Sequence, residues 1–137
     1  MRVAVVVIPQ SKRDKLLEVA KALGSGIEAQ GHRVEIIDGS DDLGSKLTIY
    51  EYVAIGTEVT SLFGGKVPAR LSAFLKNAGA ISGKRAFAFV LKKSIGADKG
   101  LQRLMKQMES EGLYLKYSEI LSSPTQATEI GKRLNIN

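Results

Sequence analysis

Hydroxyl, ammonium and guanidinium groups gather in three short polar segments of this 137-residue chain, each directly after an apolar run. The first segment contains Ser11, Lys12 and Arg13, the second begins at Thr57 and the third begins at Lys92. Hydroxyls, cationic side chains and the free N–H groups of a helix start are the donors with which proteins bind anions. No acid, base or nucleophile stands out beside them, so the pattern favours anion binding over catalysis.

The residue types that support metal and nucleophilic chemistry are scarce. The sequence has no cysteine and one histidine, His32, which excludes a disulfide framework, a cysteine nucleophile and a common zinc site. His32 has no G-x-S-x-G segment to join it in a hydrolase triad. With 44% hydrophobic and 25% charged residues the composition is ordinary, and the length fits a single domain over residues 1–137.

Apolar periodicity predicts five strands alternating with helices. Runs at 3–8, 52–56 and 86–91 are continuously apolar, as in strands covered on both faces, and weaker runs at 34–37 and 113–120 predict two more. Helical spacing predicts helices over 11–27, 67–78, 101–108 and 125–134. Residues 11–14 match the capping-box pattern, with Ser11 as N-cap, and Gly26 weakens this first helix without ending it.

The alternation predicts an α/β fold, a three-layer α/β/α sandwich around a five-stranded parallel sheet with right-handed crossovers. Ligands of such sheets bind at the carboxyl ends of the strands, near the point where the strand order reverses. This rule selects three loops, residues 9–14, 56–66 and 92–99, and these contain the three polar segments.

Positive charge is unevenly distributed along the chain. The net charge is +6, with −1 over residues 1–68 and +7 over residues 69–137. This excess is either a set of solvated faces or a basic surface for an anionic ligand or an acidic partner. If the surface is functional, charge reversal of Lys92 and Lys93 together should weaken binding steeply at low salt. The cations in or beside the three loops are Lys12, Arg13, Lys66, Lys92, Lys93 and Lys99.

The chain resembles the short-chain flavodoxins and flavodoxin-like proteins over nearly its whole length. The matching segments are YVAIGT at 52–57, GGKVP at 64–68, AFL at 73–75 and GKRAFAF at 83–89. The resemblance implies strand order 2-1-3-4-5, FMN bound noncovalently at the three loops, and electron transfer. The first loop departs from the family's T-x-T-G-x-T pattern, because residues 9–15 read PQSKRDK, without the glycine or the threonines.

The resemblance therefore implies a non-standard phosphate loop, although Ser11 could equally serve only as a helix cap. On this model the cofactor-binding residues form three groups. They are Ser11, Lys12 and Arg13 at the phosphate; Thr57, Glu58, Thr60 and Phe63 around the ring and ribityl chain; and Lys92, Lys93, Ser94 and Gly96 on the far side. A cation near the flavin would raise its reduction potential above that of an acidic flavodoxin.

Three functions fit these observations. The first is an FMN-binding electron carrier with a redox partner protein. The second is a cofactor-free flavodoxin-fold module that binds an anionic ligand or an acidic protein partner through the basic loops. The third is a flavin-dependent reductase, and whether the chain is an enzyme is left open.

Other classes are disfavoured. Receiver domains need acidic residues where Pro9 and Gly56 stand, dinucleotide-binding domains need G-x-G-x-x-G, and only net charge favours nucleic-acid binding. The run at 3–8 is too short to span a membrane and lacks a signal cleavage site, so we expect a cytoplasmic protein with no membrane partner.

Overall fold

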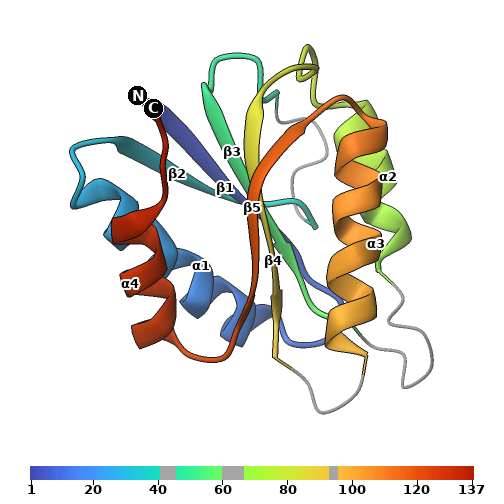
Figure 1. Ribbon diagram of the computed structural model, residues 1–137. Helices are drawn as coiled ribbons and strands as arrows, with labels where there is room; N and C mark the ends of the chain where they lie inside the picture. Colours follow the sequence, from blue (N-terminus) through green and yellow to red (C-terminus); the bar gives the residue numbers. More distant parts are fainter. Residues whose placement is uncertain (41–45, 60–66, 93–95) are drawn as a thin grey trace.

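The computed structural model describes residues 1–40, 46–59, 67–92 and 96–137. Five strands form one sheet in the order β2-β1-β3-β4-β5, with all neighbours parallel. Helices α1 and α4 cover one face, and α2 and α3 cover the other (Figure 1). The predicted three-layer α/β fold and strand order are confirmed. The elements are β1 (Arg2–Ile8), α1 (Arg13–Glu28), β2 (Arg33–Asp38), β3 (Tyr52–Thr57), α2 (Ala69–Lys76), β4 (Arg85–Leu91), α3 (Ala97–Ser110), β5 (Tyr114–Leu121) and α4 (Pro124–Arg133).

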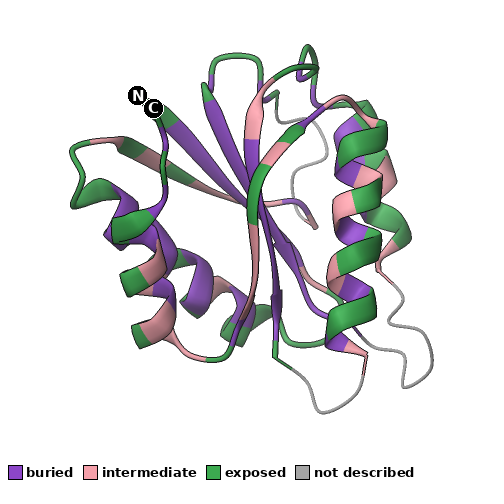
Figure 2. Cartoon of the chain, in the orientation of Figure 1, coloured by how far each residue is buried: buried purple, intermediate pink, exposed green. Residues whose placement is uncertain are grey.

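The central strands β1, β3 and β4 are buried along almost their whole length, as their unbroken apolar runs predict (Figure 2). Alternate residues point to opposite faces, so one strand supplies two cores. On β1, Val6 joins the core beneath α2 and α3, while Val5 joins the core beneath α1 and α4. Each such side chain contributes about 1.5–3 kcal/mol through burial. The result is a rigid centre that fixes where the strand ends lie.

Two glycines allow α1 and α4 to approach unusually closely. A Cβ on Gly26 would lie 2.2 Å from the Thr128 carbonyl oxygen, and one on Gly131 would lie 2.3 Å from the Leu23 carbonyl oxygen. Gln30 Nε2 donates to the Gly131 carbonyl at 2.7 Å, across 101 residues of sequence. Gly26 is therefore required by helix packing, which the sequence prediction had treated only as a local weakness.

The start of α1 differs from the prediction. The N-cap is Lys12, whose side chain makes no capping hydrogen bond, and the helix begins at Arg13. The predicted capping box with Ser11 as N-cap is wrong, because another group, described below, accepts from these backbone N–H groups. Helix α3 begins at Ala97, after Gly96 as N-cap with φ 92°. None of the helices in the described ranges has both the length and the apolar character needed to cross a membrane.

Candidate functional site

The carboxyl ends of β1 and β3 are tied together at one edge of the sheet, which we call the strand-end edge. Their register places Ile8 opposite Thr57, so the residues that follow each strand are neighbours. The Thr57 hydroxyl donates to the Ile8 carbonyl at 2.6 Å and is completely buried. Thr57, predicted as a cofactor contact, thus holds the two strand ends in register.

Glu58 places its carboxylate on the backbone of the first loop. Its Oε1 atom accepts from the N–H groups of Gln10 at 3.0 Å, of Ser11 and of Lys12. In return the Gln10 side-chain amide donates to the Glu58 carbonyl at 2.6 Å. We call this set, Glu58 with the N–H groups of residues 10–12, the Glu58 clamp.

The clamp puts a carboxylate where a helix start attracts anions. Lys12 is the N-cap of α1, and free N–H groups and the helix dipole both favour negative charge at that point. Glu58 is 3% exposed, so its carboxylate is withdrawn from water, whereas residues 10–12, whose N–H groups donate to it, are exposed. A residue 46 positions from Lys12 therefore satisfies the donors that the sequence assigned to a local cap or to a ligand's phosphate.

The second carboxylate oxygen of Glu58 is less well satisfied. Its Oε2 atom is buried and has no hydrogen-bond partner among the described residues. A buried carboxylate oxygen without a donor costs free energy, and the three bonds to Oε1 offset that cost. All three backbone hydrogen bonds of the clamp thus depend on one oxygen atom, so a substitution of Glu58 removes them together.

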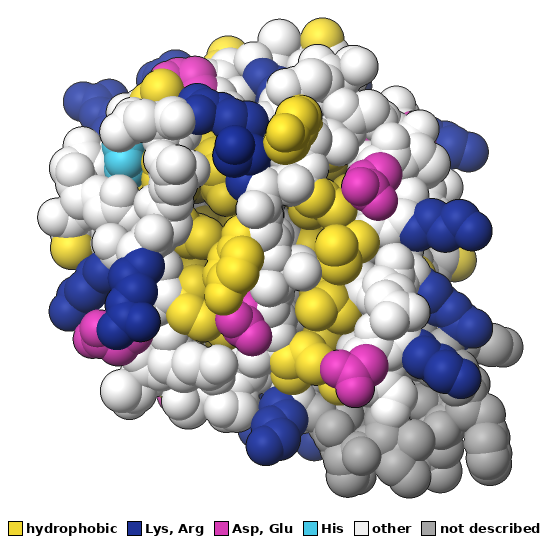
Figure 3. Space-filling model, in the orientation of Figure 1, with side chains coloured by type: hydrophobic (Ala, Val, Ile, Leu, Met, Phe, Trp, Pro, Cys, Tyr) yellow, Lys and Arg dark blue, Asp and Glu magenta, His cyan; other side chains and the backbone are white. Residues whose placement is uncertain are grey.

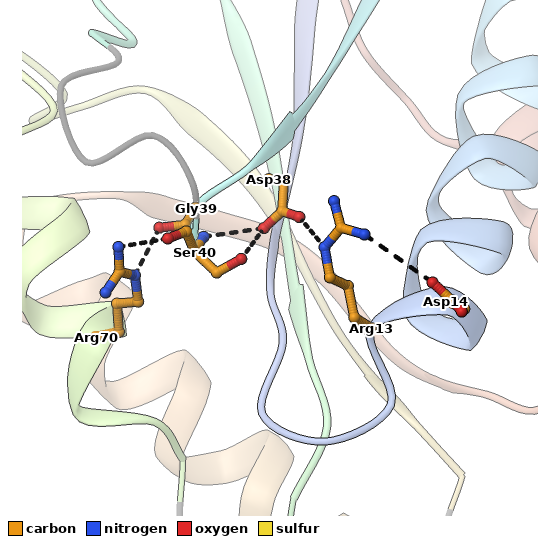
Figure 4. Close-up of polar contacts among 6 residues, drawn as sticks. All are labelled: Arg13, Asp14, Asp38, Gly39, Ser40 and Arg70. Carbon is orange, nitrogen blue, oxygen red and sulfur yellow. Dashed lines mark hydrogen bonds and ion pairs between the residues drawn. The ribbon is translucent and has the colours of Figure 1, made fainter.

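Arg13 points away from the loop and joins the end of β2 (Figure 4). Its Nε donates to Asp38 Oδ2 at 2.5 Å, and Ser40 donates to Asp38 Oδ1 through its backbone N–H at 2.9 Å and its hydroxyl at 2.6 Å. From the other face, Arg70 Nε on α2 donates to the Gly39 carbonyl at 2.9 Å. Arginines from two helices thus fix the turn after β2.

The environment of Asp38 favours its charged form. Burial by itself would raise the pKa of this carboxyl, but the hydrogen bonds from Ser40 and the guanidinium of Arg13 outweigh it and lower the pKa below the usual value. Asp38 is therefore a carboxylate at neutral pH, and Arg13 has a structural partner within the fold.

Beside the Glu58 clamp lies a cavity of about 130 Å³ with three lysines around it. Lys12, Lys15 and Lys92 are exposed, and Lys92 is anchored by its backbone N–H, which donates to the Leu121 carbonyl at 2.8 Å. The surroundings are therefore cationic even though the clamp itself is an anion. The lining residues are Ser11, Lys12, Lys15, Glu58, Val59, Leu91 and Lys92.

The structure brings together part of the predicted site. Ser11, Lys12, Glu58 and Lys92 surround one cavity, Thr57 lies buried at the strand ends, and Gly96 caps α3. Gln10 and Lys15 were missed, although Gln10 lies between Pro9 and Ser11 in the loop that the strand-end rule selects. No group of three or more potential metal ligands occurs in the described ranges. Predictions at Thr60, Phe63, Lys66, Lys93 and Ser94 lie outside the described residues.

A parallel sheet in the order 2-1-3-4-5, with polar loops at the strand ends beside the β1–β3 reversal point, defines a flavodoxin-like α/β protein. Solved flavodoxins match it over almost the full length of both chains, so the fold is that of the short-chain flavodoxins.

The similarity lies in the fold, with low sequence identity. Flavodoxin 1 from Bacillus cereus is 16% identical with a TM-score of 0.71, covering 96% of this chain and 95% of that one. A flavodoxin from the domain Archaea is 19% identical with a TM-score of 0.69, covering 97% and 94%. A short-chain flavodoxin associated with a non-canonical PDU bacterial microcompartment is 11% identical with a TM-score of 0.68, covering 96% and 95%. No protein-family model and no curated protein matches the sequence.

Proposed function

We propose that this chain is a flavodoxin-fold binding module that acts without FMN at its first loop and offers its lysine-bearing strand-end edge to an anionic group of a partner. The observation that supports this function is the Glu58 clamp, because the chain's own carboxylate accepts from the N–H groups that an anionic ligand would need.

The phosphate of FMN does not fit the first loop while the clamp is closed. Three backbone N–H groups already donate to Glu58 Oε1, so a phosphate would find them engaged. It would also meet a buried negative charge, and two like charges about 4 Å apart repel by about 4 kcal/mol at an effective dielectric constant of 20. The loop also lacks the threonines and the glycine of the family pattern.

The lysines around the cavity support an anionic partner. Lys12, Lys15 and Lys92 are exposed, and none forms an ion pair within the described part of the chain. Three exposed ammonium groups on one edge attract carboxylates or phosphates of a partner surface, and this attraction weakens as salt is added. The clamp keeps that surface from being neutralised by a phosphate bound at the helix start.

A titration with FMN and with riboflavin tests the proposal, because the two differ only in the phosphate. We expect wild-type protein to retain no FMN through gel filtration at low salt. Glu58→Ala frees the N–H groups and should bind FMN about tenfold more tightly than wild type, a difference of about 1.4 kcal/mol, with riboflavin affinity unchanged. Glu58→Gln keeps the side-chain volume and serves as the folding control.

An FMN-dependent electron carrier is the second candidate, favoured by the full-length match to solved flavodoxins. It requires the Glu58 carboxylate to leave the first loop when the phosphate arrives. Wild-type protein that retains one quenched FMN per chain would establish this candidate and refute the cofactor-free module.

A further inference from the structure

A second cavity, of about 340 Å³, lies between β5 and α4, and its size is within the usual range of small-molecule sites. It reaches Tyr52, the first residue of β3, whereas the Glu58 clamp follows the last one. A six-residue strand spans about 20 Å, so the two sites are at opposite ends of the sheet. Figure 3 shows hydrophobic side chains between β5 and α4, with Lys and Arg side chains toward the upper end.

The walls of this cavity are apolar and partly aromatic. Ile130 and Leu134 come from α4 and the residue after it, and the rings of Tyr52 and Tyr117 come from the sheet. Tyr117 is stacked on Phe87 with ring centroids 5.6 Å apart, which holds its ring in place although the residue is 49% exposed. Such walls suit a flat, apolar ligand body.

A β-bulge brings Lys116 to the edge of the same cavity, where its ammonium lies over the Tyr114 ring, 5.4 Å from the ring centroid. The register between β4 and β5 runs from Ala86 opposite Leu115 to Phe87 opposite Tyr117, so Lys116 is the additional residue. Bulges re-aim side chains, and here both Lys116 and Tyr117 line the cavity. Arg133 lines it from α4, and neither cation forms an ion pair within the described ranges.

The hydroxyl of Tyr52 lacks a partner in a position where it should have one. The residue is fully buried, and among the described residues nothing accepts from or donates to this oxygen. Burial raises the pKa of Tyr52 to about 12, so the group is a phenol at neutral pH and able to donate a hydrogen bond. An unpaired buried hydroxyl costs stability that a phenylalanine would avoid.

We infer that the cavity between β5 and α4 is a binding site for a small organic anion with a flat apolar body, of the chemical class of aromatic carboxylates. The ring lies between the tyrosines and the α4 side chains, the carboxylate faces Lys116 and Arg133, and Tyr52 supplies a hydrogen bond at the cavity wall. This site is independent of the strand-end edge and of its function.

NMR titration of ¹⁵N-labelled protein with benzoate, 2-naphthoate and indole-3-acetate tests the inference, and 2-naphthamide is the uncharged control. We expect saturable shifts at residues 116, 117, 130 and 133, with 2-naphthamide about tenfold weaker than 2-naphthoate, because hydrogen bonds to a charged group are the stronger ones. Arg133→Gln should weaken the binding of 2-naphthoate to a similar extent. Lys132→Gln, an adjacent exposed position outside the cavity lining, should leave the affinity within about twofold.

Tyr52→Phe separates a binding role from a packing role. It should raise the melting temperature of the free protein and weaken the binding of 2-naphthoate several-fold. The inference is overturned if none of the three carboxylates saturates the cavity residues, if the amide binds as well as the acid, or if Lys132→Gln weakens binding as much as Arg133→Gln. Binding by Tyr52→Phe equal to wild type would remove the hydroxyl from the site.

Discussion

Removing the Glu58 carboxylate should measurably destabilise the protein. It accepts three backbone hydrogen bonds at the start of α1, and it is almost completely buried. Loss of an N-cap costs about 0.5–2 kcal/mol, and loss of hydrogen bonds to a buried charge costs more. Two effects reduce the loss: water can hydrate the freed N–H groups of the exposed residues 10–12, and the substitution also removes the unpaired Oε2. We therefore expect Glu58→Ala to lower the free energy of unfolding by about 2–3 kcal/mol. Glu58→Gln retains an acceptor oxygen and should lose about 1 kcal/mol.

Urea and thermal unfolding at neutral pH measure this difference. For a domain of this size the Glu58→Ala loss corresponds to a decrease in melting temperature of about 6–12 °C. Inorganic phosphate should then restore stability to the variant and not to wild type. A phosphate concentration ten times its Kd would add about 1.4 kcal/mol.

Two results would refute this reasoning. If Glu58→Ala costs less than about 0.5 kcal/mol, the carboxylate does not occupy the loop in solution. If phosphate stabilises wild type and variant equally, the N–H groups are accessible while Glu58 is present, and the argument against the FMN phosphate fails.

Three further predictions follow from other parts of the fold. Because the pKa of Asp38 is lowered in the folded state, its carboxylate contributes fully to stability above about pH 3.8, the ordinary pKa of the group, and this contribution is lost as the pH falls below that value. In urea titrations, Asp38→Asn should therefore destabilise the protein more at pH 6 than at about pH 3. Gly131→Ala should lower the free energy of unfolding by more than about 3 kcal/mol, because the new Cβ would lie 2.3 Å from the Leu23 carbonyl oxygen. Gly31→Ala, where φ is positive but the space is open, should lower it by about 1 kcal/mol, and equal losses would contradict the close helix contact. Charge reversal of Lys12 and Lys92 together should lower the salt concentration that elutes the protein from heparin, and an unchanged elution would contradict the cationic edge.

The fold was predictable from the sequence because its central strands are buried on both faces. Residues 3–8 and 86–91 have no polar position, and such a run is typical of a parallel strand covered on both faces. Alternation of strands and helices then restricts the topology, since crossovers are right-handed. These are properties of short stretches of chain, and so a single sequence contains them.

The site was less predictable because its main contact joins residues that are far apart in sequence. Ser11 matches a local capping pattern, but the acceptor at the helix start is Glu58, 47 residues away. A usable signal was present. Ile8 and Thr57 end adjacent strands, which makes the next residues neighbours, and a buried-strand end is an unusual place for a carboxylate. Gly26 was misjudged for the same reason, because the Thr128 backbone that excludes a Cβ is in another helix.

The glycine contact between α1 and α4 also bears on the order in which the molecule folds. Gln30 and Gly131 are separated by 101 residues, and the facing helix backbones meet across a similar length of chain. Contacts of such long range carry a higher loop-closure cost than local ones, and a high share of them slows folding. During synthesis α1 leaves the ribosome before α4 has been made. The glycine-lined side of α1 is therefore exposed until α4 has been synthesised and packs against it. The helix that begins at the Glu58 clamp is thus made well before α4, and its glycine-lined side is covered only once α4 is present.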